Sequence, residues 1–383
     1  MPTKHLKYGG STMARTLACP AWVNLSANMP PQIAGEAAEI GTALHDAMEW
    51  IFGDESRHPD DCMGKVFSGV KIEYEHLNDK LLPAYESIID LIGEYSIKEW
   101  ALEPFVELIP DTAGGSIDFL GVSDHGKTAV IADYKFGYHL VSPEDNAQLL
   151  FYALCADADP ATNAMFKHVE KLVLAIIQPN AAGEDDMRVF ETPIHTLDVF
   201  EDNTAKAIET AESGCTTPVT GPHCKFCPAE AICPAKTGLA VKAKRLPEIH
   251  VDTLAAYLPM AEELEEWVKA VKKLAHEQME LGVKVEGYKL VNKRAMRTWS
   301  NPEDALTKVK RMRGISFEDA CDFKLKSPAQ LEKVFKAKGV DFDKVADYIV
   351  SVSSGTTLAK ASDKRPEAPS VEAFKEALKR LPE

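Results

Sequence analysis

Two short apolar runs joined by a turn are the feature of this sequence that most constrains its fold. The runs are 117–120 and 129–132, and the segment between them contains Ser123-Asp-His-Gly126. Apolar runs separated by turn residues of this kind predict an antiparallel hairpin. The chain is expected to build part of its core on this strand pair.

Charged residues lie within the first run and directly after the second. Asp118 lies in the first, and Asp133-Tyr134-Lys135 follows the second. Because side chains alternate along a strand, Asp133 and Lys135 share a face, and Asp118 can lie across from them if the register allows. Two carboxylates beside an ammonium group suit Mg²⁺ and a phosphate. The plainer interpretation is a charged pair on a solvated strand face.

Two helical patterns flank this hairpin in the sequence. His45 and Glu49 are four residues apart in an amphipathic segment, and Gln148 and Tyr152 have the same spacing in an apolar one. Residues at this spacing share a helix face. Core packing accounts for Tyr152 easily and for Gln148 less well, and a lone helix histidine is more often structural than a ligand.

In order and spacing, this series of helix His, strand Asp, strand Asp-x-Lys and helix Gln-x-x-x-Tyr resembles the motifs of RecB-type nucleases of the PD-(D/E)XK superfamily. The resemblance implies an α/β restriction-endonuclease-like core, with a central mixed sheet flanked by helices. It also implies Mg²⁺ or Mn²⁺ bound by His45, Asp118, Asp133 and the carbonyl of Tyr134. Lys135 would orient or help to deprotonate the attacking water, and Gln148 and Tyr152 would position the DNA strand or the site. Glu107 is a further acidic candidate. Ile117 replaces the usual proline of the superfamily.

Cysteines form the second informative set. Three of the eight lie in the run Cys224-x2-Cys227-x5-Cys233, and Cys19 precedes a proline far upstream. Four thiolates can hold a 4Fe-4S cluster or zinc. Cys19 lies before the nuclease-like motifs and the cysteine run lies after them. This arrangement resembles the iron-sulfur nucleases related to the AddB subunit, and the resemblance implies a 4Fe-4S cluster. His223 keeps a Cys3His zinc site open, and free buried cysteines are the plainer alternative.

Charge and composition limit the partners. The net charge of −16 disfavours nonspecific DNA binding over the whole surface. The segment from Lys284 to Gly314 is basic, however, with nine basic and three acidic residues, and Tyr288 and Trp299 within it suit stacking on unpaired bases. A solvated basic face is the plainer reading. We find no apolar run of about 18 residues and no signal-peptide pattern. We therefore expect no membrane span and a cytoplasmic protein, in the host cytoplasm if phage-encoded.

Two regions are expected, a nuclease-like domain over 1–240 and a mainly helical, partly basic region over 241–383. In the first, the pattern predicts a long helix over 81–100 and a strand buried on both faces over 169–177. Phrases such as Gly287-Tyr-Lys-Leu and Ala361-Ser-Asp-Lys-Arg-Pro366 resemble a protein family of bacteriophages and prophages, over most of the chain.

These resemblances imply a metal-dependent deoxyribonuclease. They favour an exonuclease on single strands or duplex ends over a sequence-specific endonuclease. The implied role is in phage recombination or replication, with a single-strand annealing protein as partner. The competing hypotheses are a protein that binds DNA or the replisome without cleaving, and a zinc-stabilised virion protein.

Overall fold

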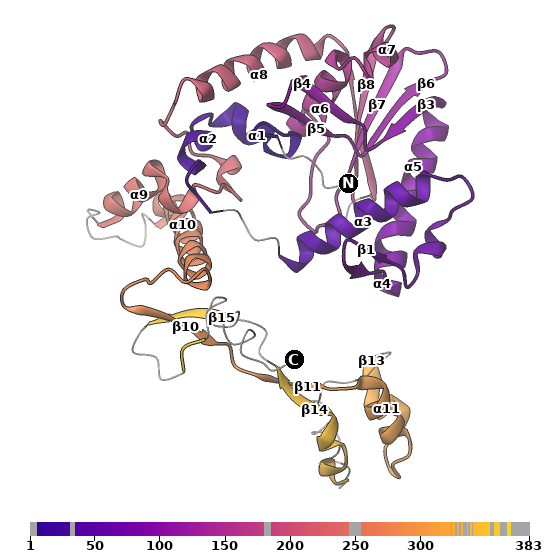
Figure 1. Ribbon diagram of the computed structural model, residues 1–383, viewed down its shortest axis with the longest axis vertical. Helices are drawn as coiled ribbons and strands as arrows, with labels where there is room; N and C mark the ends of the chain where they lie inside the picture. The colour runs from indigo at the N-terminus through magenta and orange to yellow at the C-terminus, as the bar shows by residue number, and fades with distance from the viewer. Residues whose placement is uncertain are drawn as a thin grey trace, which may run out of the picture. The chain divides into compact units, whose positions relative to one another are not determined.

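The computed structural model describes residues 6–30, 35–179, 185–244, 254–322 and parts of the chain from 324 to 368. The chain divides into two compact units, Met1–Ala256 and Tyr257–Glu383 (Figure 1). The sequence-based boundary at residue 240 lies before this division, within α9 (Pro234–Lys244).

A five-stranded mixed sheet forms the centre of the first unit. Its strand order is β3-β6-β7-β8-β9, and only the β7/β8 pair is parallel. The chain crosses from β7 to β8 through α6 (Ala147–Ala158), as a parallel pair requires. The unit is therefore α/β with a central mixed sheet, as expected. The strand bounds are β3 (Ile97–Leu102), β6 (Phe119–Ser123), β7 (Thr128–Tyr134), β8 (Lys171–Ile177) and β9 (Met187–Pro193).

The predicted hairpin is present as β6 and β7. The two strands pair antiparallel from Val122 opposite Ala129 to Phe119 opposite Ala132. Strand β8 is buried except at its first residue, as the continuous apolar run predicted. The expected helix over 81–100 is wrong at its end, because the helix stops at Glu94 and β3 begins at Ile97. Ser96, at φ +50°, makes the reversal between them.

Helices cover both faces of the sheet. On one face, Ala129, Ile131 and Leu172 pack with α1, α6 and α8, and on the other Val130 and Val173 pack with α3 and α5 (Figure 1). Helix α6 is buried without interruption from residue 149 to 156, because the sheet and α1 contact it on different sides. The bounds are α1 (Gly10–Ala18), α3 (Glu36–Phe52), α5 (Leu82–Glu94), α6 (Ala147–Ala158) and α8 (Thr196–Glu212).

Shorter elements complete the first unit. Strands β4 and β5 form an antiparallel pair beside α6. The bounds are α2 (Ala21–Ser26), β1 (Val66–Phe67), β2 (Val70–Lys71), α4 (Tyr74–His76), a π-helical turn (Leu77–Leu81), β4 (Phe105–Ile109), β5 (Ala113–Ser116) and α7 (Asn163–Phe166).

The second unit combines helices with strand pairs, so the expectation of a mainly helical region holds only in part. Strand β10 pairs with β15 and β11 with β14, both antiparallel, and these pairs bring together positions that are 50 or more residues apart in the sequence. A separate core forms around Trp299, Val309 and Phe335. The bounds are α10 (Leu254–Glu280), β10 (Tyr288–Asn292), β11 (Met296–Trp299), α11 (Pro302–Lys310), α12 (Phe317–Ala320), β12 (Cys321–Asp322), β13 (Lys324–Leu325), β14 (Ile349–Val352) and β15 (Thr356–Lys360). Within the described part of the chain, no helix is long and apolar enough to cross a membrane.

Candidate functional site

The two predicted carboxylates lie at the same end of the β6/β7 pair. The register, continued by one residue past the Phe119–Ala132 pair, sets Asp118 opposite Asp133. Both side chains are buried, with 8% and 3% of their surface exposed. The backbone N–H of Tyr134 donates a hydrogen bond to Oδ2 of Asp118 at 2.6 Å, which fixes one oxygen of that carboxylate. Two buried acidic side chains do not contribute to apolar packing. Their presence therefore marks this strand end as a candidate functional site.

A candidate metal group forms around Asp118. One ligand atom each from His45, Glu103 and Asp118 lie within 4.8 Å of one another. His45 comes from α3 and its Nδ1 is 3.4 Å from Oδ1 of Asp118. Glu103 follows β3 with φ +46°, and its backbone N–H donates to the carbonyl of Asp118 at 3.4 Å. One imidazole and two carboxylates can hold a divalent ion.

This group opens onto a large cleft. The cleft has a volume of about 1490 Å³ and is lined by His45, Glu103 and Asp118 together with α1, α3 and the β4/β5 pair. Glu49, which shares a face of α3 with His45 as predicted, also lines it. The three candidate ligands therefore face an open cleft.

Burial and neighbouring carboxylates together raise several pKa values at this site. For His45, burial works to lower the pKa, but the carboxylates of Asp118, Asp133 and Glu103 raise it to about 9. Burial and then the charge of Asp118 raise the pKa of Glu103 to about 8. Burial also raises the pKa of Asp133 to about 6, although Lys135 opposes the shift. A bound cation would relieve this accumulation of like charge.

A second chain of contacts runs from Asp133 to α6. The ammonium of Lys135 lies 2.7 Å from Oδ2 of Asp133 and donates to Oε1 of Gln148 at 3.0 Å. The amide of Gln148 in turn donates to Oδ1 of Asp133 at 2.6 Å and lies 3.5 Å from the hydroxyl of Tyr152. The structure thus brings together all four of these predicted residues. Asp133 belongs to this series of contacts and is not one of the three candidate ligands, which are His45, Glu103 and Asp118.

Close packing explains why Tyr152 holds its position. A Cβ added at Gly10 would lie 2.5 Å from Cε1 of Tyr152, and one at Gly115 would lie 3.2 Å from it. The ring therefore lies against bare backbone from α1 and β5. Core packing and a role in the site are compatible for this residue.

The candidate ligand His45 is held by two aromatic rings. Its imidazole meets the rings of Tyr134 and Phe136 edge-on, at centroid distances of 5.7 and 5.4 Å. These two rings stack on each other at 6.0 Å. The side chain of Tyr134 therefore orients the histidine, a role separate from the backbone carbonyl that the resemblance implied as a ligand.

The acidic residue that the sequence reasoning missed is Glu103. The candidate Glu107 accepts a hydrogen bond from the backbone N–H of Asp111 at 2.8 Å and is not in the group around Asp118. Glu103 was overlooked because residues up to Trp100 were predicted to be helical. Recognition of β3 as a strand next to β6 would have placed Glu103 beside Asp118.

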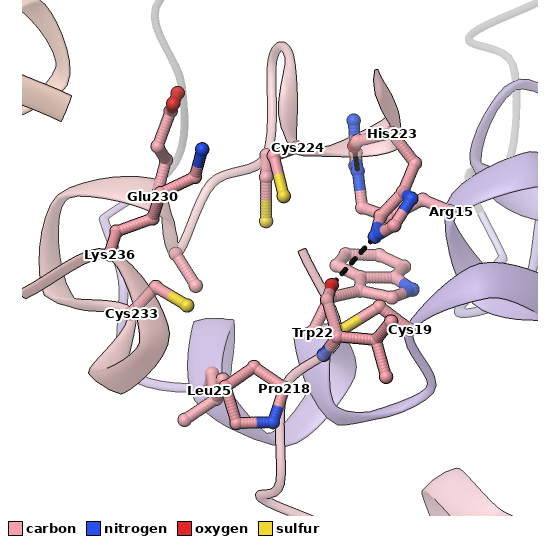
Figure 2. Close-up of a pocket in the computed structure, with 13 residues that line it drawn as sticks. Arg15, Cys19, Trp22, Leu25, Pro218, His223, Cys224, Glu230, Cys233 and Lys236 are labelled. Atoms are coloured by element: carbon pink, nitrogen blue, oxygen red, sulfur yellow. Dashed lines mark hydrogen bonds between the residues drawn. The ribbon is translucent and has the colours of Figure 1, made fainter. Parts of the chain in front are cut away.

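The four predicted cysteines line one pocket, although they come from two distant segments. Cys19 is the residue after α1, and the other three follow α8. Figure 2 shows Cys19, Cys224 and Cys233 around the pocket. Backbone N–H groups of Val219 and Gly221 point at the sulfurs of Cys19 and Cys224, at 3.3 and 3.4 Å. Among the described residues, no three cysteine sulfurs lie within 4.8 Å of one another, so the thiols are gathered without converging on one point. The lining cysteines are Cys19, Cys224, Cys227 and Cys233.

The pocket is bounded by basic side chains, and α1 is tied to the cysteine loop. Arg15 donates to the carbonyls of His223 and Phe226 at 3.3 and 3.0 Å, and Lys236 also lines the pocket. Nε2 of His223 is 2.8 Å from the carbonyl of Val219, so this ring nitrogen is already engaged. Burial raises the pKa of the Cys227 thiol, which a metal would have to deprotonate.

The basic segment of the second unit has only one of its two aromatics available. Tyr288 is 44% exposed on β10, whereas Trp299 is buried in the core of that unit. The expected stacking role of Trp299 is therefore wrong, since core packing accounts for it. Arg294 and Arg313 are exposed, in agreement with a basic surface.

Fold and site together define an α/β protein with a candidate divalent-metal group at one end of a mixed sheet. The family model described as "Protein of unknown function (DUF2800)" matches residues 5–366, and the chain belongs to this family. The match covers most of the chain, as the resemblance predicted. Among solved structures, one titled "Crystal structure of SSO0001" is similar, with 14% identity, a TM-score of 0.25, and coverage of 56% of this chain and 94% of that one. At that TM-score the likeness carries no argument.

Proposed function

We propose that this protein is a Mg²⁺- or Mn²⁺-dependent deoxyribonuclease with a PD-(D/E)XK-type core. The observation that carries the proposal is the pairing of two sets of side chains at one strand end. His45, Glu103 and Asp118 offer a divalent-ion site on an open cleft, and the Asp133–Lys135 pair lies beside it. In metal-dependent phosphodiester hydrolysis, the cation and a positioned polar group both stabilise the charge that develops on the phosphate.

The residues divide the chemistry between them. When bound, the metal would lower the pKa of a water and offset charge on the phosphoryl oxygens. Burial lowers the pKa of Lys135, but the carboxylate of Asp133 has the larger effect. The pKa of Lys135 is therefore raised. Lys135 therefore acts as a cationic donor that orients water or phosphate oxygen, rather than as the base. Gln148 keeps both partners in place through its hydrogen bonds to Asp133 and Lys135.

The proposal includes a 4Fe-4S cluster at the cysteine pocket, with a single zinc ion as the alternative. Zinc binds four thiolates at about 2.3 Å, which draws the sulfurs to within about 4 Å of one another. A four-iron cluster offers a separate iron corner to each thiolate, so its ligands need not converge. The backbone N–H groups directed at two of the sulfurs and the engaged Nε2 of His223 are the reasons for which the proposal prefers iron to a Cys3His zinc site. Such a cluster would join the start of the first unit to its end.

The test is incubation of anaerobically purified protein with end-labelled single- and double-stranded DNA, in Mg²⁺, Mn²⁺ or EDTA. We expect metal-dependent degradation by the wild type and none by Asp133→Ala or Lys135→Ala. Asp124→Ala is the matched control, because Asp124 is exposed in the turn at the other end of the same hairpin. Cleavage by folded Asp133→Ala would refute the site, and the labelled products reveal the polarity of an exonuclease.

The second candidate is a protein that binds DNA or a replication partner without cleaving it. The exposed basic residues of the second unit favour it. Within the described residues we recognise no base-reading helix, so an exonuclease on strands or ends is preferred over a sequence-specific endonuclease. A role in phage recombination or replication, with an annealing protein as partner, remains part of the proposal. Metal-independent DNA binding with no turnover in any lane would favour the binding protein.

A further inference from the structure

A loop with outward-facing side chains follows the catalytic-type lysine directly. It runs from Phe136 to Val141, between β7 and α6. Tyr138 is 83% exposed and Leu140 50% exposed, with His139 exposed between them. Single exposed apolar side chains are ordinary, but this group lies next to the candidate site.

The side-chain amide of one buried glutamine holds the backbone of this loop in place. Gln178, fully buried after β8, donates from Nε2 to the carbonyls of Gly137 and His139, both at 2.8 Å. Its Oε1 accepts from the backbone N–H of Val141 at 3.1 Å and from Arg188 at 2.7 Å. Every hydrogen-bonding position of the Gln178 side chain is therefore committed to the loop or to its neighbour.

Two cations add to this anchoring. Arg188 donates to the carbonyl of Val141 at 3.0 Å, and Lys80 donates to the carbonyl of Phe136 at 2.7 Å. The ammonium of Lys80 also lies 4.9 Å from the centroid of the Tyr138 ring. The loop thus holds its side chains outward on an ordered backbone, which lowers the entropy lost when they bind a partner.

The loop is also close to the reacting groups. Phe136, its first residue, packs edge-on against His45, and Lys135 precedes it. Tyr138 is three positions after Lys135 in the sequence, so their Cα atoms are at most about 11 Å apart. A strand with its phosphate at Lys135 would bring a base within reach of Tyr138.

We propose that Tyr138 is a stacking platform for an unpaired base, and that the substrate is single-stranded DNA or a duplex end with a free strand. This inference rests on the proposed nuclease function and names its substrate class. Aromatic rings bind bases of any sequence through their faces, and Lys80 beside the ring attracts the phosphate backbone. Bases inside a duplex already stack on their neighbours and cannot offer a face to Tyr138.

Binding can be measured apart from cleavage by replacing Mg²⁺ with Ca²⁺. Fluorescence anisotropy would compare a fluorescein-labelled oligothymidylate with a blunt hairpin duplex of equal length. Loss of one stacked base predicts that Tyr138→Ala weakens single-strand binding roughly 5- to 150-fold. Tyr138→Phe should stay within about twofold of the wild type because the ring is kept. Tyr74→Ala is the matched control, since Tyr74 is 70% exposed and lies on α4, outside the Phe136–Val141 loop.

The outcomes separate this inference from the nuclease proposal. Equal single-strand affinity of Tyr138→Ala and wild type would overturn the platform, whether or not the protein cleaves DNA. Wild-type binding to duplex alone would overturn it as well. Binding that depends on Tyr138, together with no cleavage in Mg²⁺ or Mn²⁺, would keep the platform and refute the nuclease.

Discussion

Metal binding at the His45–Glu103–Asp118 group should release protons, and the size of the effect follows from the site's charge. A pH of 7 is about two units below the pKa of His45, which is about 9, and about one unit below the pKa of Glu103, which is about 8. Both side chains are therefore protonated at pH 7. Each of these two ligands must lose its proton before it can bind the ion. The two differences add up to about three pH units, which cost about 4 kcal/mol of binding free energy, or a factor of roughly 10³ in Kd. Affinity for Mn²⁺ should rise with pH and level off above about 9.

The assay is isothermal titration calorimetry with Mn²⁺ between pH 6.5 and 7.5, in buffers of different ionisation enthalpy. With both groups protonated, the Kd should fall close to 100-fold over that unit, with nearly two protons released per ion. Glu103→Gln removes one titrating ligand and should lower the release to about one proton. A Kd independent of pH, or an unchanged proton count in Glu103→Gln, would refute the reasoning.

Two further variants test the packing and the cysteine pocket. Gly10→Ala places a Cβ 2.5 Å from the Tyr152 ring and should cost about 1–3 kcal/mol of stability by overpacking, whereas Gly93→Ala, with no atom within 4 Å of its Cβ, should not lower the Tm. An unchanged Tm for Gly10→Ala in differential scanning fluorimetry would contradict the contact. Cys227→Ser should lose iron and visible absorbance in anaerobic preparations, whereas Cys215→Ser, outside the pocket, should keep both. Full iron content in Cys227→Ser would remove it from the ligand set.

Local patterns in the sequence were sufficient for much of the first unit. The period-2 alternation and the turn at Ser123 to Gly126 set the β6/β7 pairing, which put Asp118 across from Asp133. Spacing of four residues placed Gln148 and Tyr152 on one face of α6, in contact with each other. These features involve neighbours in sequence, whose geometry is fixed by the strand and helix periods.

Tertiary structure alone decided which distant residues complete the site. Glu103 joins His45 and Asp118 only because β3 pairs with β6. The sequence pattern predicts a helix up to Trp100, so it does not predict this strand pairing. Gln178 holds the Phe136–Val141 loop through contacts that span about 40 positions of sequence. Such contacts depend on how the strands and helices pack, which local propensity does not encode. The sequence by itself thus determined the strand pair and its charged residues, and the packing of the sheet determined which other groups meet them.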